Sequence, residues 1–210
     1  MPQPIFPLPV PPLDPFWDKT SQTSINYQRD GGKRRHAGVD LVANTGTPVL
    51  AMADGVVLQV AEFYQGTWAI VVLHPGLGTV RYGEVDRQVL VRPDQAVHQG
   101  DAIGIVGKRK GSERAMLHLE WYADFRHFDT PSEGDPRLSQ KQNRPYERRS
   151  DLADPTNMLR RSPVQGWPHN IAAQSTTADP ARDRLVHLLK TLPFSSGKPD
   201  QNDPCLNEVK

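Results

Sequence analysis

The sequence predicts a mainly β protein, in which an antiparallel sheet forms a hybrid barrel-like domain and short helices follow near the C-terminal end. Short runs of apolar and β-branched residues recur from about residue 33 to residue 125. Gly, Pro and Asp-Gly turns separate these runs, and many short strands punctuated in this way are typical of an antiparallel sandwich or barrel. The hydrophobic content of 37% supports a core of modest size.

The first 30 residues are predicted to form a proline-rich arm. Prolines crowd the first 16 positions, and proline fixes φ and lacks a backbone donor, so this stretch is expected to be extended. Such a stretch could bind an SH3-like partner. We favour an arm that lies along the domain, or a loose leader.

The strands are expected in the stretch that follows, and turn residues separate them. Asp54-Gly55 between two apolar runs is a strong hairpin signal, and the His-Pro-Gly-Leu-Gly sequence at 74–78 predicts a second turn. Residues 97–104 resemble a turn of biotinyl/lipoyl-type hybrid barrels, which we interpret as shared fold geometry because no matching lysine context is present. The predicted strands are residues 39–43, 49–53, 56–60, 68–73, 79–82, 102–107 and 116–122.

The C-terminal part is predicted to contain two helical segments. Residues 126–150 are polar and expected to form a loop, and residues 151–159 are expected to close the domain with a helical turn. After a linker, Asp179-Pro180 is a good helix start, and leucines at helical spacing follow it. The predicted domain spans residues 31–160, and residues 161–210 hold a linker, an amphipathic helix and a flexible tail.

Charge and cysteine content exclude several classes of protein. Lys+Arg 25 against Asp+Glu 24 is a balanced charge, which provides no electrostatic basis for binding nucleic acid or an anionic membrane. No apolar run approaches the length of a membrane span, so membrane insertion is not expected. Cys205 is the single cysteine, which rules out an intrachain disulfide and a cysteine-based metal site.

Three separated residues are candidate metal ligands. His36 and Asp40 are four positions apart, and a bend at Gly38 could bring both side chains to one point. His118 and Glu120 alternate with leucines, so on a strand they share one face. Two histidines and one carboxylate suit a catalytic zinc ion, since three protein ligands leave the fourth position for water.

The neighbourhoods of these residues resemble one known family. Four segments are similar, in order and spacing, to motifs of the lysostaphin/LytM-type zinc peptidases, which cut peptidoglycan: residues 36–40, 46–57, 100–107 and 117–120. The resemblance covers about residues 31–125. It implies a β-rich groove in which His36, Asp40 and His118 hold zinc.

The resemblance also identifies two departures from the family pattern. The family usually has two further histidines, one in H-x-H and one in Y-x-H, and here Met116 and Glu84 stand at those positions. Three explanations are open. Glu84 is the general base, with Tyr82 or an arginine such as Arg114 helping to hold the oxyanion. Alternatively, a histidine from elsewhere, such as His127, fills the gap, or the site binds zinc without turnover.

The retained ligands favour an active or metal-binding site. Members of the family that have become non-catalytic regulators commonly lose metal ligands, whereas this chain keeps all three. Glu120 is expected to orient His118 rather than to act in the reaction itself.

The implied function is zinc-dependent hydrolysis of peptidoglycan peptide bonds, in a crosslink or in a stem. The zinc ion would lower the pKa of water toward about 7 and polarise the scissile carbonyl. An N-acetylmuramoyl-L-alanine-type amidase fits the same three ligands. A non-catalytic cell-wall-binding or regulatory module is the other alternative, because of the methionine at position 116.

The location of the substrate leads to a further expectation. Peptidoglycan lies outside the cytoplasmic membrane, and no Sec-type signal is visible in the sequence. We expect the protein to be made in the cytoplasm and to act in the periplasm or cell wall after delivery by another route, as a secreted antibacterial effector would. Such an effector would call for an immunity protein in the producing cell.

Overall fold

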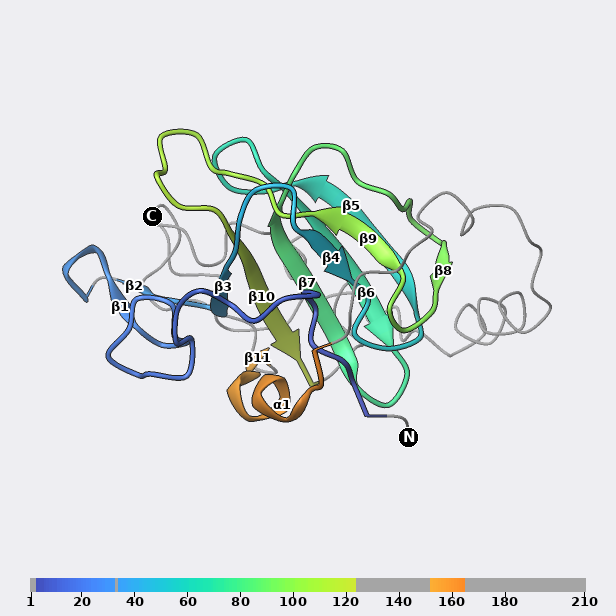
Figure 1. The fold of residues 1–210 in the computed structure, drawn as a ribbon, viewed down its shortest axis with the longest axis horizontal. Coiled ribbons are helices and arrows are strands. Elements are labelled where there is room, and N and C mark those ends of the chain that lie inside the picture. The colour runs from blue at the N-terminus through green and yellow to red at the C-terminus, as the bar shows by residue number, and fades with distance from the viewer. Residues whose placement is uncertain (1–2, 33, 124–151, 165–210) are drawn as a thin grey trace, which may run out of the picture.

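The computed structural model describes residues 3–32, 34–123 and 152–164 of the chain (Figure 1). These residues form a mainly antiparallel β fold with little helix, which confirms the predicted fold class. The largest sheet has the strand order β11-β10-β7-β6-β5-β8, and β3 pairs with β10 off this path. Its strands are β3 (Val39–Val42), β5 (Gly55–Glu62), β6 (Trp68–His74), β7 (Gly78–Val85), β8 (Ala96–Val97), β10 (Met116–Tyr122) and β11 (Leu152–Ala153).

A two-stranded sheet lies over one face of the large sheet (Figure 1). It pairs β4 (Pro48–Leu50) with β9 (Ala102–Ile105). The core lies between the two layers, and Val49 and Ile103 of the small sheet share it with Ile70, Val72 and Leu119 of the large one. These side chains are all fully buried. Because successive strand residues point to opposite faces, the other face of β10 is left for polar groups.

The small sheet ends earlier than the sequence predicts. β4 stops at Leu50, although residues 49–53 were expected to form one strand. The backbone N–H of Met52 instead donates to the hydroxyl of Tyr82 at 3.0 Å, and the Met52 carbonyl accepts from the N–H of Ile5 at 2.9 Å. The backbone N–H and C=O of Met52 are therefore bonded outside the β4–β9 ladder.

The N-terminal arm packs along the domain. Ile5, Phe6, Leu8 and Phe16 are buried, and the last three belong to the main core. Its backbone also bonds to the sheets: the N–H of Leu50 donates to Pro7 O, and the N–H of Leu13 donates to Val42 O, both at 2.8 Å. The hydrophobic residues between the prolines thus anchor an extended segment that lacks a ladder of its own.

A bulge in β7 changes the direction of one side chain. Trp68 pairs with Val85 and Ile70 pairs with Tyr82, so Gly83 and Glu84 together face one residue of β6. Glu84 has a φ of 58°, which non-glycine residues rarely adopt. A β-bulge re-aims side chains, and this one interrupts the alternation that would otherwise place Glu84 on the same face as Tyr82.

The C-terminal described segment contains β11 and the helix α1 (Thr156–Arg161). The sequence predicted a helical turn over residues 151–159, and the helix begins and ends a little later. The predicted loop at 126–150, the helix beginning at Asp179 and Cys205 lie outside the described residues. Within the described ranges, no helix is long and apolar enough to cross a membrane.

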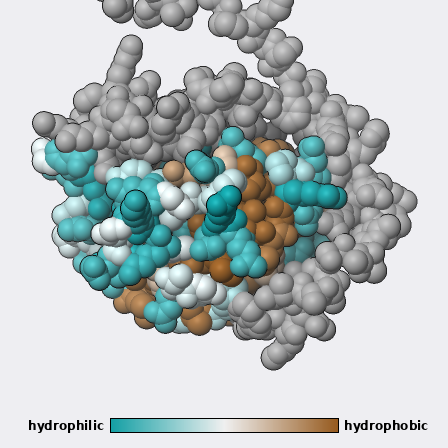
Figure 2. All heavy atoms as spheres, turned by 90° about the horizontal axis from the view of Figure 1, so that it is seen from above, coloured by the Kyte–Doolittle hydropathy of each residue, from teal (hydrophilic) through white to brown (hydrophobic). Residues whose placement is uncertain are grey.

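Large apolar side chains are mostly buried. Figure 2 shows one face of the molecule, on which an apolar area lies among hydrophilic residues. Among the described residues the large exposed ones are Val10, Leu13, Trp17, Leu90 and Val164.

A buried histidine links β6 to the core. The hydroxyl of Tyr82 lies 2.9 Å from Nε2 of His74, and Nδ1 of His74 lies 3.1 Å from the carbonyl of Asp54. Since the carbonyl can only accept, Nδ1 carries the proton and Nε2 accepts from the tyrosine. Burial lowers the pKa of His74 from 6.5 to about 4, so the ring is neutral in the folded protein at pH 5 and above.

We therefore expect His74 to make folding sensitive to acid. As pH falls from 6.5 toward 4, the unfolded chain binds a proton at this histidine and the folded chain does not, so stability is lost. The loss reaches about 3 kcal/mol, from the 1.36 kcal/mol that each pKa unit represents. Urea unfolding at pH 7.5 and pH 4.5 should give a smaller pH dependence for His74→Gln than for the wild type. The same substitution at the exposed His98 is the control, and an equal pH dependence in wild type and His74→Gln would contradict the expectation.

Candidate metal centre

The pairing of β3 with β10 brings the three candidate ligands together. Asp40 lies directly opposite His118 in the ladder, so both side chains project from the same face. His36 comes from the loop that enters β3. Gly38 lets this loop approach β10, because a Cβ at this position would clash with the backbone oxygen of Leu119. The bend expected at Gly38 therefore has a steric reason.

The three ligand atoms form a compact triangle. Nε2 of His36 is 3.0 Å from Oδ1 of Asp40 and 3.1 Å from Nδ1 of His118, and the last two atoms are 2.8 Å apart. Tetrahedral bonds of about 2.0–2.1 Å to zinc would separate such atoms by about 3.3 Å. The triangle is thus a few tenths of an ångström tighter than a zinc site, and these residues fit the ion with a small outward adjustment.

Both histidines are held in the tautomer that a metal needs. Nδ1 of His36 lies 2.8 Å from the carbonyl of Ser24, so Nδ1 donates and Nε2 keeps its lone pair. Nε2 of His118 lies 3.0 Å from Oε1 of Glu120, so here Nε2 donates and Nδ1 is left for the ion. Such partners fix the ring orientation of metal-ligating histidines and raise their basicity.

Glu120 belongs to a buried polar network behind His118. Its Oε2 accepts from Nη1 of Arg81 at 2.7 Å and from the hydroxyl of Tyr122. The side chains of Arg81 and Glu120 are 2% and 1% exposed, so the pair is shielded from solvent. Because the guanidinium and the carboxylate neutralise each other, Glu120 can stay ionised in the interior and hold the proton of His118.

The charges in the cluster follow from these contacts. Burial acts to raise the pKa of Asp40, but His36 and His118 outweigh it and hold the pKa far below its usual range. Burial lowers the pKa of His36. For His118 burial acts in the same direction, but hydrogen bonds to Asp40 and Glu120 prevail and raise the pKa to about 10. Without an ion, the cluster thus keeps a proton on His118, and metal binding must displace it.

Glu84 is buried, and the charges of Asp40 and His118 act on it. Its carboxylate forms an ion pair with Nε of Arg109 at 3.1 Å, in a geometry that is not a hydrogen bond. Burial raises the pKa of Glu84 to about 7, and the negative charge of Asp40 adds to this, against the opposing charges of Arg109 and His118. A carboxylate with a pKa near 7 suits a proton acceptor at neutral pH.

The structure does not bring Tyr82 to this site. Tyr82 pairs with Leu119, so it lies on the core face of the sheet, opposite the face of His118. It is fully buried, and its hydroxyl bonds to Met52 N–H and to His74. The role in holding an oxyanion that was expected for Tyr82 therefore has no geometric basis, because strand alternation directs the ring away from the ligands.

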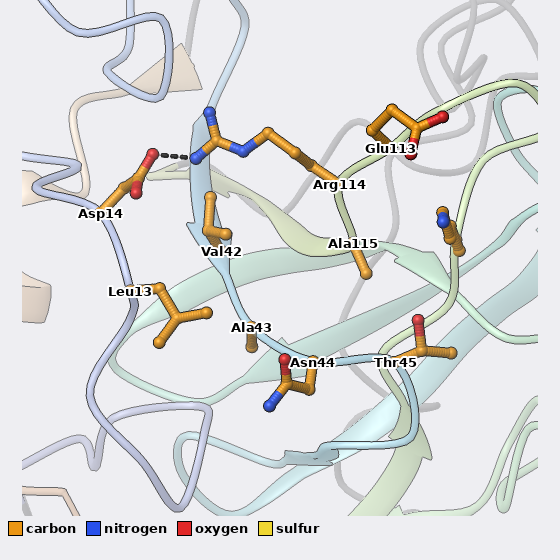
Figure 3. Close-up of a pocket in the computed structure, with 10 residues that line it drawn as sticks. Leu13, Asp14, Val42, Ala43, Asn44, Thr45, Glu113, Arg114 and Ala115 are labelled. Atoms are coloured by element: carbon orange, nitrogen blue, oxygen red, sulfur yellow. Dashed lines mark hydrogen bonds and ion pairs between the residues drawn. The ribbon is translucent and has the colours of Figure 1, made fainter.

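Arg114 is also engaged elsewhere. It forms an ion pair with Asp14 of the N-terminal arm, at the edge of a pocket of about 560 Å³ (Figure 3). The pocket lies beyond the ends of the ligand strands, with Val42 and Ala115 in its lining. His127, the other candidate to fill the gap, lies outside the described residues.

Sequence reasoning missed the contribution of the segment before β3. The carbonyl of Ser24 fixes His36, the carbonyl of Thr23 accepts from the N–H of Asp40 at 2.8 Å, and Nη2 of Arg29 contacts Oδ2 of Asp40 at 3.2 Å. Two of these partners are backbone atoms, which have no signature in the sequence. Arg29 also lies outside the region of family resemblance, so no motif pointed to it.

We expect Glu120→Gln to weaken both the fold and the metal site. The amide cannot neutralise Arg81, and breaking a buried pair costs about 3–5 kcal/mol of stability. Loss of a metal ligand's carboxylate partner typically reduces affinity by about 10–100-fold. Urea unfolding and competition with a zinc chelator measure the two effects, with the exposed Glu62→Gln as control. Unchanged zinc affinity in a folded Glu120→Gln protein would show that the carboxylate does not support His118.

The chain is similar to proteins of one family. The family model that matches is Peptidase family M23, over residues 34–130. The murein hydrolase activator EnvC of Escherichia coli is 32% identical over 106 residues, which are 50% of this chain and 25% of that protein. An uncharacterized metalloprotease of Haemophilus influenzae is 37% identical over 98 residues, which are 46% of this chain and 20% of that protein.

A solved structure is also similar. Lysostaphin, an antimicrobial peptidase from Staphylococcus simulans, has a TM-score of 0.48 at 20% sequence identity, with 85% of this chain and 61% of that chain covered. The two curated relatives carry different descriptions, one as an activator and one as a metalloprotease. This chain spans a quarter or less of the length of both, so the likeness concerns only part of each.

Proposed function

We propose that this protein, in which residues 34–130 match peptidase family M23, is a zinc-dependent hydrolase of peptidoglycan peptide bonds. Members of that family are peptidoglycan hydrolases or regulators. The observation that carries the proposal is the triangle of His36, Asp40 and His118, with both histidines in metal-binding tautomers. A regulator does not need three ligands with both histidines held in the metal-binding tautomer. The bond proposed is in a crosslink or a stem peptide.

The chain's own residues suit amide hydrolysis. A zinc ion in this site would polarise the scissile carbonyl and make water more acidic. Glu84 then takes a proton from water as the water oxygen bonds to the carbonyl carbon, and the carbonyl oxygen gains the negative charge. The amide nitrogen leaves with the proton that Glu84 returns, so one C–N bond breaks and one C–O bond forms. Burial keeps Glu84 away from bulk water, which preserves its affinity for the proton.

The direct test is digestion of purified sacculi by zinc-loaded protein, followed by mass spectrometry of the released fragments. New amino and carboxyl termini within peptides would support an endopeptidase. Release of intact stem peptides from the glycan would instead identify an amidase that uses the same centre. Absence of any new termini across a range of pH and with several metals would contradict the proposal.

A second function has support from two observations. Met116 stands where the family usually has a histidine, and a thioether can neither transfer a proton nor stabilise an anion. One relative is described as a murein hydrolase activator. A non-catalytic regulatory or cell-wall-binding module would bind zinc and sacculi without cleaving them. Addition to a separate hydrolase, with and without sacculi, would reveal an activating effect.

The proposed substrate requires the protein to reach the cell wall. We propose delivery to the periplasm or cell wall for use as an antibacterial effector. An effector would be accompanied by an immunity protein that binds over the zinc site. Fractionation of cells with active secretion tests the delivery, and protein found only in the cytoplasm would count against it. Toxicity of periplasmic expression, relieved by a neighbouring gene product, would test the pairing with an immunity protein.

A further inference from the structure

The hairpin before β3 places a guanidinium beside the metal ligands. Nη2 of Arg29 is 3.2 Å from Oδ2 of Asp40, and the other oxygen of that carboxylate, Oδ1, is one corner of the ligand triangle. The guanidinium therefore contacts the carboxylate of a metal ligand through the oxygen that is not part of the triangle. Arg29 comes from β1 (Gln28–Arg29), which pairs with β2 (Arg34–Arg35) ahead of β3, and it lies outside the residues that match the family.

Arg29 is held in place by contacts that leave most of its donors available. Nη2 also donates to the carbonyl of Gln22 at 2.7 Å, and the guanidinium lies 5.6 Å from the centroid of the Tyr27 ring. Both hydrogen bonds come from Nη2. Among the described residues, none accepts a hydrogen bond from Nε or Nη1 of Arg29, and 24% of the side chain is exposed. The group thus combines a fixed position with N–H donors that no described residue accepts from, on a side chain that is partly exposed.

Three other arginines of the domain are already paired with carboxylates. Arg81 is fully buried against Glu120, Arg109 is paired with Glu84, and Arg114 is paired with Asp14. Met116 shares a strand face with His118 and has no N–H or O–H to offer. The described part of the site therefore has one partly exposed cation in contact with a ligand carboxylate.

We propose that Arg29 is a catalytic residue that donates a hydrogen bond to the oxygen of the scissile carbonyl as this oxygen becomes negative. The role rests on the proposed hydrolysis. It fits the need of the reaction, since developing charge is stabilised by donors held ready in a site of low polarity. The salt bridge to Asp40 fixes the guanidinium beside the ligands, and Nε and Nη1 remain as donors that no described residue occupies.

The first experiment compares Arg29→Gln and Arg29→Lys with the wild type. Activity is expressed per bound zinc, which separates catalysis from metal loading. Removing one such donor typically lowers kcat by about 100–1,000-fold, and we expect a loss of this order in Arg29→Gln with most of the zinc affinity retained. Arg29→Lys, which keeps the charge but not the planar donors, should recover part of kcat. Arg92→Gln, at an exposed arginine before β8, is the control.

The second experiment has no need of activity. Isothermal titration of inorganic phosphate, a tetrahedral anion, into zinc-loaded protein measures binding at the same place. Loss of a charge-assisted hydrogen bond should reduce phosphate affinity by about tenfold or more in Arg29→Gln and leave it unchanged in Arg92→Gln. If the wild type hydrolyses nothing, the proposed function fails and this titration still tests the donor.

Two results would overturn the proposal. One is a kcat per bound zinc that is the same in Arg29→Gln and wild type, with only zinc affinity reduced, which would make Arg29 a partner of Asp40 and nothing more. The other is equal phosphate affinity in the two proteins.

Discussion

Replacing His36 with alanine should abolish zinc binding and hydrolysis together. Two ligands cannot hold the ion in a three-ligand site, and Asp40 and His118 would keep each other as partners, with the proton on His118. We expect zinc affinity to fall by at least about 100-fold, beyond the effect of losing an outer partner. Metal content after gel filtration and cleavage of sacculi measure the two effects.

Two comparisons make the His36→Ala result specific. His98→Ala removes a half-exposed histidine away from the cluster and should change neither zinc content nor activity. The side chain of His36 is only 6% exposed, so its removal also leaves a cavity. Circular dichroism therefore establishes whether the variant is folded. Full zinc occupancy in folded His36→Ala protein would mean that the metal is bound elsewhere.

Replacing Glu84 with glutamine should leave zinc bound and remove most of the turnover. The amide has the shape of the carboxylate but cannot take a proton, and general base catalysis contributes about 100–10,000-fold to rate. We therefore expect kcat to fall within this range while KM and zinc content change little. The measurement is the initial rate of peptide release from sacculi at saturating zinc.

The position of Glu84 in the β7 bulge allows a sharp control. Glu84→Gln keeps the backbone conformation, and its ion-pair partner Arg109 remains able to bond with the amide oxygen. Glu62→Gln removes an exposed carboxylate and should be as active as the wild type. If Glu84→Gln is fully active, the proton acceptor is another group, and a residue outside the described ranges, such as His127, becomes the first to test.

The sequence was informative where a local rule determines geometry. Alternation predicted that His118 and Glu120 share a face of β10, and the glycine at 38 predicted a bend before β3. Each of these features depends on residues that are neighbours in the chain, so one sequence is enough to infer it. The hairpin predicted at Asp54-Gly55 is wrong, because the flanking strands lie in different sheets: β4 pairs with β9, and β5 pairs with β6 and β8.

The site could not be completed from the sequence, because its remaining parts depend on long-range contacts. The bulge at Gly83 and Glu84 interrupts the alternation of side chains along β7, and no local sequence pattern predicts it. Tyr82 was expected at the metal centre, but its side chain lies on the core face of β7, away from the ligands. Arg29 reaches Asp40 only because the segment before β3 folds back beside that strand.

The packing of the N-terminal arm against β3 has a consequence for how the protein behaves as a solute. β3 pairs with β10 on one side, and its other side would offer free N–H and C=O groups to any passing strand. Thr23 accepts from Asp40, and Leu13 donates to Val42, so the arm occupies that side. Removing the arm should therefore expose unpaired backbone N–H and C=O groups along β3 and favour self-association through this strand. The prolines that keep the arm extended also prevent it from becoming a further strand on which a neighbour could add.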